Sequence, residues 1–589
     1  MDKTQSTESL EHIRHTLAHL TAASVLELYP GAQNAIGPAI EDGFYQEFEL
    51  PIAISEKDLP TIEKKMRTKL KSWKHFILKK TSADEARKIF SWNKYKTELI
   101  NDFENTGKDI TITTTGDFVD LCKGGHVEDI SKINPNAFKL VRVAGAYWKG
   151  DEKNIMLTRI YGFAFETPQA LEAHLALRAE AEKRDHKKLG KELDLFLFSD
   201  LVGAGLPLWT PRGTLLRTIL DEFIWQLRMA KGYERVTIPH ITKKDLYDVS
   251  GHWEKFQEDL FHITTREGHE FAMKPMNCPH HTQIFARHPF SYREMPQRYA
   301  ETTMVYRDEQ SGELGGLSRV RSITQDDAHV FCRESQVKKE VFNVWDIINT
   351  FYGAFGFTEL RVRLSLHDPK HFEKYLGAKE VWQKTEDQLR EIVKERGMQA
   401  HEAPGEAAMY GPKVDFLASD ALGREWQVAT IQIDRNMPER FDLTCNNEKG
   451  EKERVVMIHA AIMGSIERFL SILIEHFAGK FPLWISPVQV AILPVSEHYV
   501  ATAKKLAATF EEAEIRTEVD TSNESVGKKI RMAEKSYVPY MLVLGEKEKD
   551  LTSLAVRIRG QKDVGFFETE KLLELLKKKI MSKEIELTI

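Results

Sequence analysis

The residues best suited to chemistry lie between positions 298 and 332, in the stretch RYAETTMVYRDEQSGELGGLSRVRSITQDDAHVFC. Arg307, Glu309, Arg319 and Arg321 follow an apolar, strand-like run and flank a glycine-containing turn. A guanidinium group suits phosphate because its donors form a planar fork, and a carboxylate can accept a hydrogen bond from an amino-bearing base. The pattern predicts a β-hairpin that binds a nucleoside triphosphate. A surface hairpin with ordinary ion pairs is the alternative.

A second group of reactive residues lies near the start of the chain. His15 and His19, in HTLAH, stand four residues apart and therefore share one face of the helix predicted over residues 9–29. Cys122 and His126, in CKGGH, enclose two glycines. Together the four side chains could hold zinc or position a water molecule. The alternative is that these histidines are unrelated and share no role.

The bulk composition limits the classes of protein that need considering. A chain of 589 residues, 42% hydrophobic and 29% charged, is an ordinary soluble protein of about four domains. It contains no long apolar run and starts with a polar segment, so we expect neither a membrane span nor a secretory signal. Four scattered cysteines favour a reducing cytoplasm. The net charge of −6 neither supports nor excludes an RNA partner.

The elements needed to position these residues suggest an α+β multidomain protein. Strands are predicted at 43–50 and 109–115, and a charged, helix-favouring segment follows them. Strand runs with helices at their margins predict an antiparallel sheet in the middle of the chain, and alternating short strands and helices predict a small α/β unit at its end. The expected domains are residues 1–167, a linker helix over 168–195, residues 196–485 and residues 486–589.

The hairpin resembles motif 2 of class II aminoacyl-tRNA synthetases, and the TQDDAH that follows it resembles the threonyl-tRNA synthetase family in particular. Gly464 and the helix that carries Arg468 resemble motif 3, and the helix predicted over 214–231 resembles motif 1, which implies a homodimer. The resemblance implies an antiparallel class II catalytic core with Mg²⁺ and ATP. It assigns ATP binding to Arg307, Glu309, Arg319 and Arg468, and catalysis to Arg307, Arg319, Gln325 and Arg468.

The same resemblance implies a zinc site built from Cys278, His329 and His459. Three protein ligands leave one position open, which is the catalytic type of zinc site. Such a site could bond the amino and hydroxyl groups of threonine and so reject valine, which an apolar pocket separates poorly. Asp327 is placed to accept the hydroxyl proton. Further threonine-binding positions implied are Tyr410, Lys413, Gln427, Thr430 and Gln432.

The chain departs from the family pattern at three places in this region. His280 replaces the usual glycine of CPGH and is either a competing metal ligand or a bulkier neighbour of Cys278. Ile323 stands where an aromatic residue commonly stacks on adenine, which bears on ATP affinity. His459 is followed by Ala460 instead of arginine.

The first domain resembles the editing domain of threonyl- and alanyl-tRNA synthetases, which implies hydrolysis of seryl-tRNA. The implied editing residues are His15, His19, Lys96, Asp120, Cys122 and His126. We treat them as groups that position water and transfer protons, with a metal left open. Serine keeps both functional groups of threonine and lacks one methyl, so binding alone supplies only about 1–3 kcal/mol of discrimination. Gly125 replaces the proline of the family's CxGPH.

The last domain resembles an anticodon-binding domain, whose implied base-reading residues are Asn523, Glu548 and Arg557. Ser525 stands where the family often has a basic residue. Most family members begin with a ubiquitin-like domain, and this sequence begins at the editing helix. The implied partners are tRNA(Thr), ATP, L-threonine and a second copy of the chain, with no membrane.

Three functions remain open from the sequence. The first is a threonine–tRNA ligase with editing in the same chain. The second is a non-catalytic, tRNA-binding paralogue of a synthetase, which the substitution at Ile323 would favour. The third is a related ligase for serine or proline, against which the retention of Asp327 beside the three metal-ligand positions argues.

Overall fold

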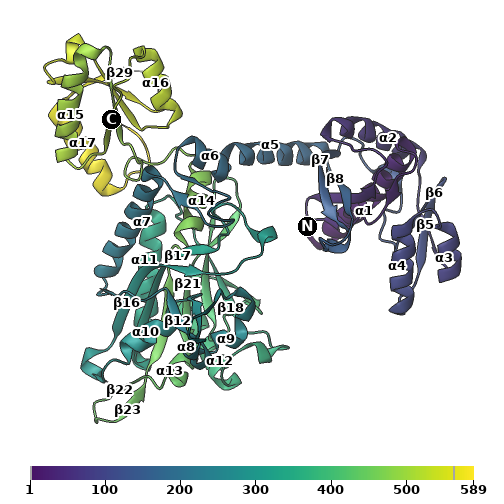
Figure 1. Cartoon of the computed structure of the whole chain (residues 1–589), viewed down its shortest axis with the longest axis horizontal. Helices are drawn as coiled ribbons and strands as arrows, with labels where there is room; N and C mark the ends of the chain where they lie inside the picture. Colours follow the sequence, from purple (N-terminus) through teal and green to yellow (C-terminus); the bar gives the residue numbers. More distant parts are fainter. Residues whose placement is uncertain (1–2, 562–563, 589) are drawn as a thin grey trace. The chain divides into compact units, whose positions relative to one another are not determined.

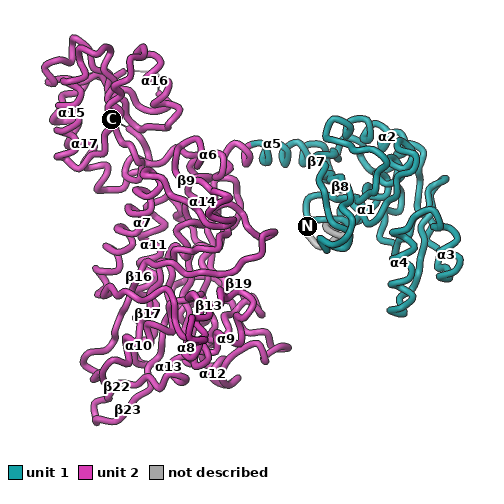
Figure 2. Tube along the Cα trace, in the orientation of Figure 1, with its two compact units in different colours: residues 1–179 teal, residues 180–589 magenta. Residues whose placement is uncertain are grey.

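The computed structural model describes residues 3–561 and 564–588. The chain divides into two compact units, residues 1–179 and 180–589. Figure 1 colours the chain by residue number, and Figure 2 colours it by unit. Each unit is described by itself. No helix in the described part of the chain combines the length and apolar character needed to cross a membrane.

The first unit is built around a five-stranded antiparallel sheet with the order β1–β3–β8–β7, in which β2 also pairs with β3. The helix predicted over 9–29 is longer than expected and starts six residues earlier. Its apolar residues pack with those of α2 on one face of the sheet, where Phe44, Phe48 and Ile160 are fully buried. The elements are α1 (Lys3–Leu28), β1 (Gln33–Asn34), β2 (Ala39–Ile40), β3 (Gly43–Glu49), α2 (Leu59–Ser72), β7 (Phe138–Tyr147) and β8 (Met156–Ala164).

A smaller three-stranded sheet, β4–β5–β6, completes the first unit. The helices α3 and α4 pack on it through a separate core that contains Phe90 and Ile100. Asn93 caps α4 by accepting hydrogen bonds from the backbone N–H groups of Tyr95 and Lys96, which fixes where Lys96 leaves the helix. The elements are β4 (Ile77–Lys80), α3 (Ala83–Ile89), α4 (Lys94–Asn105), β5 (Thr111–Thr115) and β6 (Phe118–Leu121).

The segment predicted as one connecting helix over 168–195 forms two helices, α5 (Pro168–Arg184) and α6 (His186–Glu192). Asp185 separates them because its side chain accepts hydrogen bonds from the N–H groups of Lys187 and Lys188 and so starts a new helix. The side chain of His186 then forms a hydrogen bond with Glu475, with Nδ1 lying 2.7 Å from the carboxylate oxygen Oε1.

The second unit contains an eight-stranded sheet with the order β11–β16–β17–β24–β21–β20–β18–β19. Only the outer pairs β11–β16 and β18–β19 are parallel, so the predicted antiparallel core is present. Its strands are β11 (Glu234–Arg235), β16 (Gln297–Tyr306), β17 (Ser322–Cys332), β18 (Arg361–Leu366), β19 (Ala400–Pro404), β20 (Lys413–Ser419), β21 (Glu425–Asp434) and β24 (Val456–Ala461).

Three helices, α7 (Pro211–Met229), α11 (Val337–Gly353) and α14 (Ile466–His476), share one apolar core with this sheet. Along β17, Ala328, Val330 and Cys332 belong to that core, and alternation sends the residues between them to the opposite face. Further helices are α8 (Lys244–Ser250), α9 (His252–Lys255), α10 (Cys278–Phe285), α12 (Lys379–Glu395) and α13 (Asn436–Arg440). Small sheets are formed by β9 (Phe196–Leu197) with β10 (Leu208–Trp209), by β12 (Ile241–Lys243), β13 (His262–Thr264) and β14 (Glu270–Met273), and by β15 (Phe290–Ser291), β22 (Thr444–Asn446) and β23 (Lys452–Arg454).

The end of the chain forms the predicted small α/β sheet, with the order β26–β25–β27–β28–β29 and its own apolar core. The strands are β25 (Val490–Pro494), β26 (Thr517–Val519), β27 (Tyr540–Leu544), β28 (Ser553–Ile558) and β29 (Val564–Glu568). The helices are α15 (Val500–Glu512), α16 (Val526–Lys535) and α17 (Thr569–Ser582).

A buried carboxylate ties the helical layer to the sheet. Asp326 is fully buried on β17, pairs with Arg228 of α7 at 3.1 Å, and accepts backbone hydrogen bonds of 2.9–3.0 Å from Ile462, Met463 and Gly464. Burial raises the pKa of Asp326 to about 6, against the effect of Arg228. The carboxylate thereby holds the loop that leads into α14.

We expect Asp326→Ala to lower the free energy of unfolding by about 3–5 kcal/mol, because it leaves the Arg228 guanidinium and three N–H groups buried without their partner. Urea unfolding followed by circular dichroism would measure the change. Lys338→Ala, which removes an exposed pair with Glu395, is the control and should cost less than about 1 kcal/mol. Equal losses in the two variants would contradict the anchoring role.

Candidate active site and hydrolytic site

The open face of the eight-stranded sheet brings the predicted ligase residues together in two rows. Across β17, β24, β21 and β20, one row runs through His329, His459, Gln432 and Lys413. The neighbouring row, two residues along each strand, holds Asp327, Ala461, Thr430 and Asp415. Residues that are 130 positions apart in the chain, such as His329 and His459, therefore become direct cross-strand neighbours.

The three predicted metal ligands converge. Cys278, at the first turn of α10, and the imidazoles of His329 and His459 offer donor atoms that lie within 4.8 Å of one another. The side chains of all three are buried. His329 Nε2 lies 3.1 Å from His459 Nδ1, so these two nitrogens face one another.

The other nitrogen of each ring already has a partner. His459 Nε2 lies 2.9 Å from the carboxylate of Asp434, and His329 Nδ1 lies 2.7 Å from His281 Nδ1. Outer partners of this kind orient imidazole ligands and leave the inner nitrogen free to coordinate. Burial lowers the pKa of His329 well below its usual value, which keeps the ring neutral.

The donor set fits a zinc ion. One thiolate and two imidazoles are typical zinc ligands, and three of them leave a fourth position for substrate. Burial raises the pKa of the Cys278 thiol well above its usual value, with Asp327 and Asp434 acting in the same direction. A cation beside this thiol would offset that penalty, since a coordinating thiol is deprotonated.

A cleft of about 560 Å³ borders the two rows at Gln432, Thr430 and Ala461 and contains the predicted nucleotide-binding residues. Arg307 follows β16, and Arg468 lies in the first turn of α14. Glu309, predicted to bond the adenine amino group, accepts a hydrogen bond of 2.7 Å from Arg319. The lining also includes Gln325, Gln427, Thr430 and Gln432.

Several polar atoms in this cleft have no partner among the described residues. They are Arg307 Nε, Thr430 Oγ1 and Gln432 Oε1, all buried. Buried polar groups normally form hydrogen bonds, so unpaired ones that line a cleft indicate a ligand or ordered water.

Three other predicted threonine-binding residues have partners. Asp327 is held by Asn277 at 3.0 Å, Lys413 pairs with Asp415 at 2.7 Å, and Tyr410 stacks on His459 with ring centroids 4.7 Å apart.

The departures from the family pattern take different places in this site. His280 is not among the converging donors, and its Nε2 lies 2.6 Å from the hydroxyl of Thr242. Of the two alternatives, this geometry favours the bulkier neighbour. Ile323 lines the nucleotide cleft, where an isoleucine offers no aromatic face to a base.

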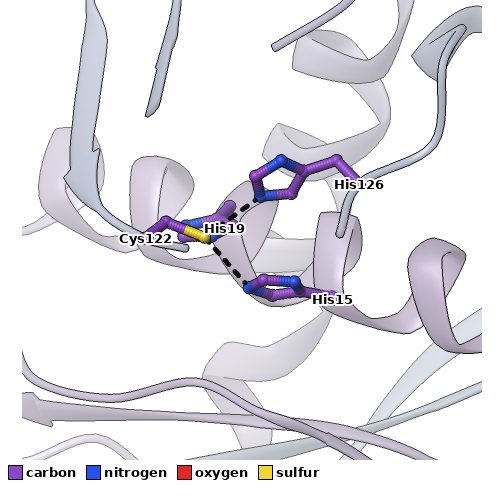
Figure 3. A group of neighbouring side chains, drawn as sticks. All are labelled: His15, His19, Cys122 and His126. Atoms are coloured by element: carbon purple, nitrogen blue, oxygen red, sulfur yellow. Dashed lines mark hydrogen bonds between the residues drawn. The ribbon is translucent and has the colours of Figure 1, made fainter. Parts of the chain in front are cut away.

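In the first unit, the four predicted editing residues with imidazole or thiol groups also converge (Figure 3). Cys122 Sγ lies 3.5 Å from His15 Nε2 and 3.4 Å from His126 Nε2, and the donor atoms of all four lie within 4.8 Å of one another. Asp120 lies behind them and contacts His19 at 3.0 Å and Lys96 at 2.6 Å. A pocket of about 640 Å³ includes His15, His19, Lys96, Asp120 and Cys122 in its lining.

Charge in this cluster is distributed differently from charge in the group of Cys278, His329 and His459. Burial by itself lowers the pKa of His19, but the hydrogen bond with Asp120 and the proximity of Cys122 outweigh it and raise the pKa to about 9. Burial raises the pKa of the Cys122 thiol, but hydrogen bonds with His126 and His15 and the proximity of His19 outweigh it and lower the pKa to about 3. Near neutral pH the site therefore holds a thiolate beside an imidazolium.

The glycines of CKGGH set the path of the loop that carries His126. Gly124 and Gly125 have φ values of +95° and +86°. Proline is fixed near −65°, so the family's proline could not adopt the conformation found at Gly125. The glycine therefore permits a backbone path before His126 that proline could not follow.

The predicted anticodon-binding residues lie on three elements of the last sheet domain. Asn523 is exposed in the segment before α16, and Arg557 lies on β28. Glu548 is buried and accepts a hydrogen bond of 3.0 Å from the N–H of Gly545. The Nε of Arg557 is buried and has no partner among the described residues.

Comparison with known proteins gives three family matches along the chain. The class II core domain of tRNA synthetases (G, H, P, S and T) matches residues 261–477, an anticodon-binding domain matches 489–579, and the second additional domain of threonyl- and alanyl-tRNA synthetases matches 110–161. The threonine–tRNA ligase of Porphyromonas gingivalis is 48% identical over 96% of this chain and 87% of its own length. The threonine–tRNA ligase of Gloeobacter violaceus is 46% identical over 98% of this chain and 93% of its own length. The RNA-binding domain of threonyl-tRNA synthetase from Cryptosporidium parvum superposes with a TM-score of 0.64 at 35% identity, covering 67% of this chain and 98% of that one.

The chain belongs to the threonyl-tRNA synthetase family. Relatives this similar over nearly the whole chain confirm the resemblance drawn from the motifs, and with it the class II core, the anticodon-binding domain and the editing-associated domain.

Some residues of the synthetase site were not found from the sequence. His281 and Asp434 hold the outer nitrogens of the two histidines, and Asn277 holds Asp327. Asn277 and His281 lie in the same MKPMNCPHH segment as Cys278, so a polar residue on either side of a predicted ligand was an available signal. Asp434 offered no such signal, because only the sheet register brings it to His459.

The low pKa of Cys122 predicts how its thiol reacts. In chelator-treated protein, alkylation of Cys122 by iodoacetamide should change only a few-fold between pH 6 and pH 8, because the thiol is already ionised. An ordinary thiol would be alkylated about 100-fold more slowly at pH 6 than at pH 8. Mass spectrometry of the modified peptide measures the rate, and the buried Cys278, Cys332 and Cys445 should react far more slowly. A tenfold change per pH unit would show that Cys122 is not a thiolate.

Proposed function

We propose that this chain activates L-threonine with ATP·Mg²⁺ and transfers it to tRNA(Thr), and that its first unit hydrolyses seryl-tRNA(Thr). The observation that carries the proposal is the convergence of Cys278, His329 and His459 beside the unpaired polar atoms of the nucleotide cleft. In the first step, a carboxylate oxygen of threonine attacks the α-phosphorus of ATP and pyrophosphate leaves. In the second, a hydroxyl of the 3′-terminal ribose attacks the carbonyl carbon and AMP leaves.

The positively charged residues of the cleft suit the first step. Arg307 and Arg468 flank the cleft and would hold the phosphates while charge moves toward the leaving pyrophosphate. Arg319 and Gln325 would complete the binding of the nucleotide and the substrate carboxylate. Because Glu309 already bonds Arg319, adenine would be read by a carboxylate whose position is fixed before ATP arrives.

Selection of threonine follows from the polar groups around the zinc ligands. A zinc ion held by Cys278, His329 and His459 would supply a Lewis acid to which the amino and hydroxyl groups of threonine bind. Asp327, fixed by Asn277, would accept the hydroxyl proton, and Gln432 and Thr430 supply unpaired polar atoms nearby. Tyr410, Lys413 and Gln427 would complete the pocket. Valine lacks the hydroxyl and would leave these groups unpaired, which costs a factor of about 10⁴–10⁵ in comparable sites.

Serine satisfies the same groups, so rejection of serine needs a second site. The cluster of His15, His19, Cys122 and His126 would position the water that attacks the ester carbonyl, and an imidazole would accept its proton. Lys96 and Asp120 hold His19 in place. Hydrolysis would release serine and leave the tRNA with a free 3′-terminal hydroxyl.

The remaining parts of the proposal concern partners and setting. Asn523, Glu548 and Arg557 would read anticodon bases, and the helix α7 of the motif 1 segment would pair two copies of the chain. A cytoplasmic setting is consistent with four cysteines that are all free.

Cys278→Ser tests the zinc assignment. We expect wild-type protein to contain about one zinc ion per chain and the variant almost none, because a buried hydroxyl is a poor substitute for thiolate. Threonine-dependent exchange of pyrophosphate into ATP should fall below detection. Cys445→Ser, which alters a buried thiol outside the group of converging donors, is the control. Full zinc content in the Cys278 variant would place the ion elsewhere, and no exchange by wild-type protein would favour the non-catalytic paralogue.

His15→Ala combined with His19→Ala tests the second site. Aminoacylation with threonine should stay within about twofold of wild type, whereas clearance of seryl-tRNA should fall by at least about 100-fold, since general acid–base catalysis typically contributes that much. Release of radiolabelled serine from preformed seryl-tRNA measures clearance. His75→Ala, in the same unit but outside the cluster, controls for nonspecific effects. Normal clearance by the double variant would refute the assignment.

A further inference from the structure

The five-stranded sheet of the first unit has a second face that its apolar core does not use. The helices α1 and α2 pack against Phe44, Phe48 and Ile160 on one side. Alternation sends Tyr45, Arg159 and Tyr161 to the other side, where each is half-buried. This second face carries no part of the catalytic or hydrolytic groups described above.

The strand register arranges the residues of this face in rows across β3, β8 and β7. Tyr45, Tyr161 and Arg142 form one row. Glu47, Arg159 and Ala144 form the next row on one side, and Gly43, Phe163 and Lys139 form the next row on the other. Aromatic and cationic side chains therefore lie beside one another over three neighbouring strands.

These side chains stack on one another. The guanidinium carbon of Arg159 lies 4.1 Å from the ring centroid of Tyr45, and that of Arg142 lies 4.7 Å from the ring of Tyr161. Arg178 of α5 lies 5.4 Å from the ring of Phe163. The result is a series of flat, cationic and aromatic surfaces between Phe163, which packs on His174 of α5, and Leu157, which packs on Tyr95 and Trp148.

The charge of this face is positive and mostly uncompensated. Glu47 is buried and already pairs with Arg159. Lys139, Arg142 and Arg178 are exposed and form no ion pair within residues 3–561 and 564–588. Aromatic and guanidinium planes that bind unpaired bases, together with cations that bind phosphates, are the features by which proteins recognise single-stranded RNA.

The face adjoins the hydrolytic pocket across the edge of β3. The N–H of Tyr45 donates to the carbonyl of Pro38 at 3.3 Å, and that of Glu47 donates to Ile36 at 2.9 Å. Ile36 and Pro38 also line the pocket, as does Gln46, which points to the opposite side of the sheet from Tyr45. A chain that ends in the pocket can therefore continue over this edge onto the stacked face.

We propose that this face binds the unpaired nucleotides at the 3′ end of the tRNA while its terminal residue occupies the hydrolytic pocket. Bases would stack on Tyr45, Tyr161 and the planes of Arg142 and Arg159, and phosphates would contact Lys139, Arg142 and Arg178. The inference rests on the proposed hydrolytic function for the identity of the RNA, and on the geometry of the sheet for the surface itself.

Tyr161→Leu and Arg142→Gln in the full-length chain test the surface. The probe is a fluorescein-labelled single-stranded RNA ending in ACCA, followed by anisotropy at several salt concentrations. Loss of one stacking plane should weaken binding by about tenfold, and loss of one phosphate contact should reduce the slope of log K against log salt by about 0.7. Tyr161→Phe, which keeps an aromatic plane, should bind as wild type does.

Matched controls come from the same unit. Tyr147→Leu removes an exposed tyrosine from the other face of β7, and Lys153→Gln removes an exposed cation from a neighbouring loop. Thermal unfolding of each variant should stay close to that of wild type. Equal RNA binding by the Tyr161 and Arg142 variants and by these controls would overturn the proposal, as would equally weakened binding by Tyr161→Phe.

Hydrolysis of seryl-tRNA separates this proposal from the proposed function. We expect the KM for seryl-tRNA to rise about tenfold in Tyr161→Leu with kcat unchanged, and threonine-dependent pyrophosphate exchange to be unaffected. If wild-type protein failed to hydrolyse seryl-tRNA, the hydrolytic assignment would fall, and the oligonucleotide comparison would still decide whether the face binds RNA. A change in kcat alone would show that Tyr161 acts on the cluster and would overturn the binding role.

Discussion

The period-two alternation of β17 is the constraint on which the synthetase site depends. Ala328, Val330 and Cys332 must enter the helical core, so Asp327 and His329 must face the other way. The register of the antiparallel partner β24 then places His459 opposite His329. A register slip of one residue would bury the polar set in the core, so the apolar packing of the helices enforces the positions of the substrate-facing residues.

Asp326 is the exception that connects the two faces. It lies on the helical side with Ala328 and Val330, where a carboxylate is costly, and it is accepted there because Arg228 and three backbone N–H groups surround it. Those N–H groups belong to the turn before α14, the helix that carries Arg468. The same carboxylate therefore fixes the helical layer and the direction from which a phosphate-binding arginine enters the cleft.

Local patterns predicted most of the elements, and non-local contacts explain what they missed. The apolar periodicity within α1 predicted the helix, and the glycine-containing turn after β16 predicted the hairpin, because both signals lie within a few residues. The break at Asp185 was missed because a charged, helix-favouring composition outweighed one capping aspartate. Asp434 could not be predicted as the partner of His459, because the two residues lie 25 positions apart and only the folded sheet brings them together. The conformation of Gly125 depends on a loop path that a glycine permits and does not dictate.

The two clusters use the same kinds of side chain in opposite states of charge. Around Cys278 and His329, burial dominates, so the thiol is held protonated and the imidazole neutral. Around Cys122 and His19, Asp120 and the neighbouring rings dominate, so thiolate and imidazolium compensate one another. The first group gains most from an external cation, because a bound metal would supply the positive charge needed to stabilise Cys278 as a thiolate. The second already contains that charge in His19, and a cation placed there would first have to displace the imidazolium proton. Under the proposed function, zinc would therefore belong to the synthetase site, and the second cluster would act on water through its own side chains.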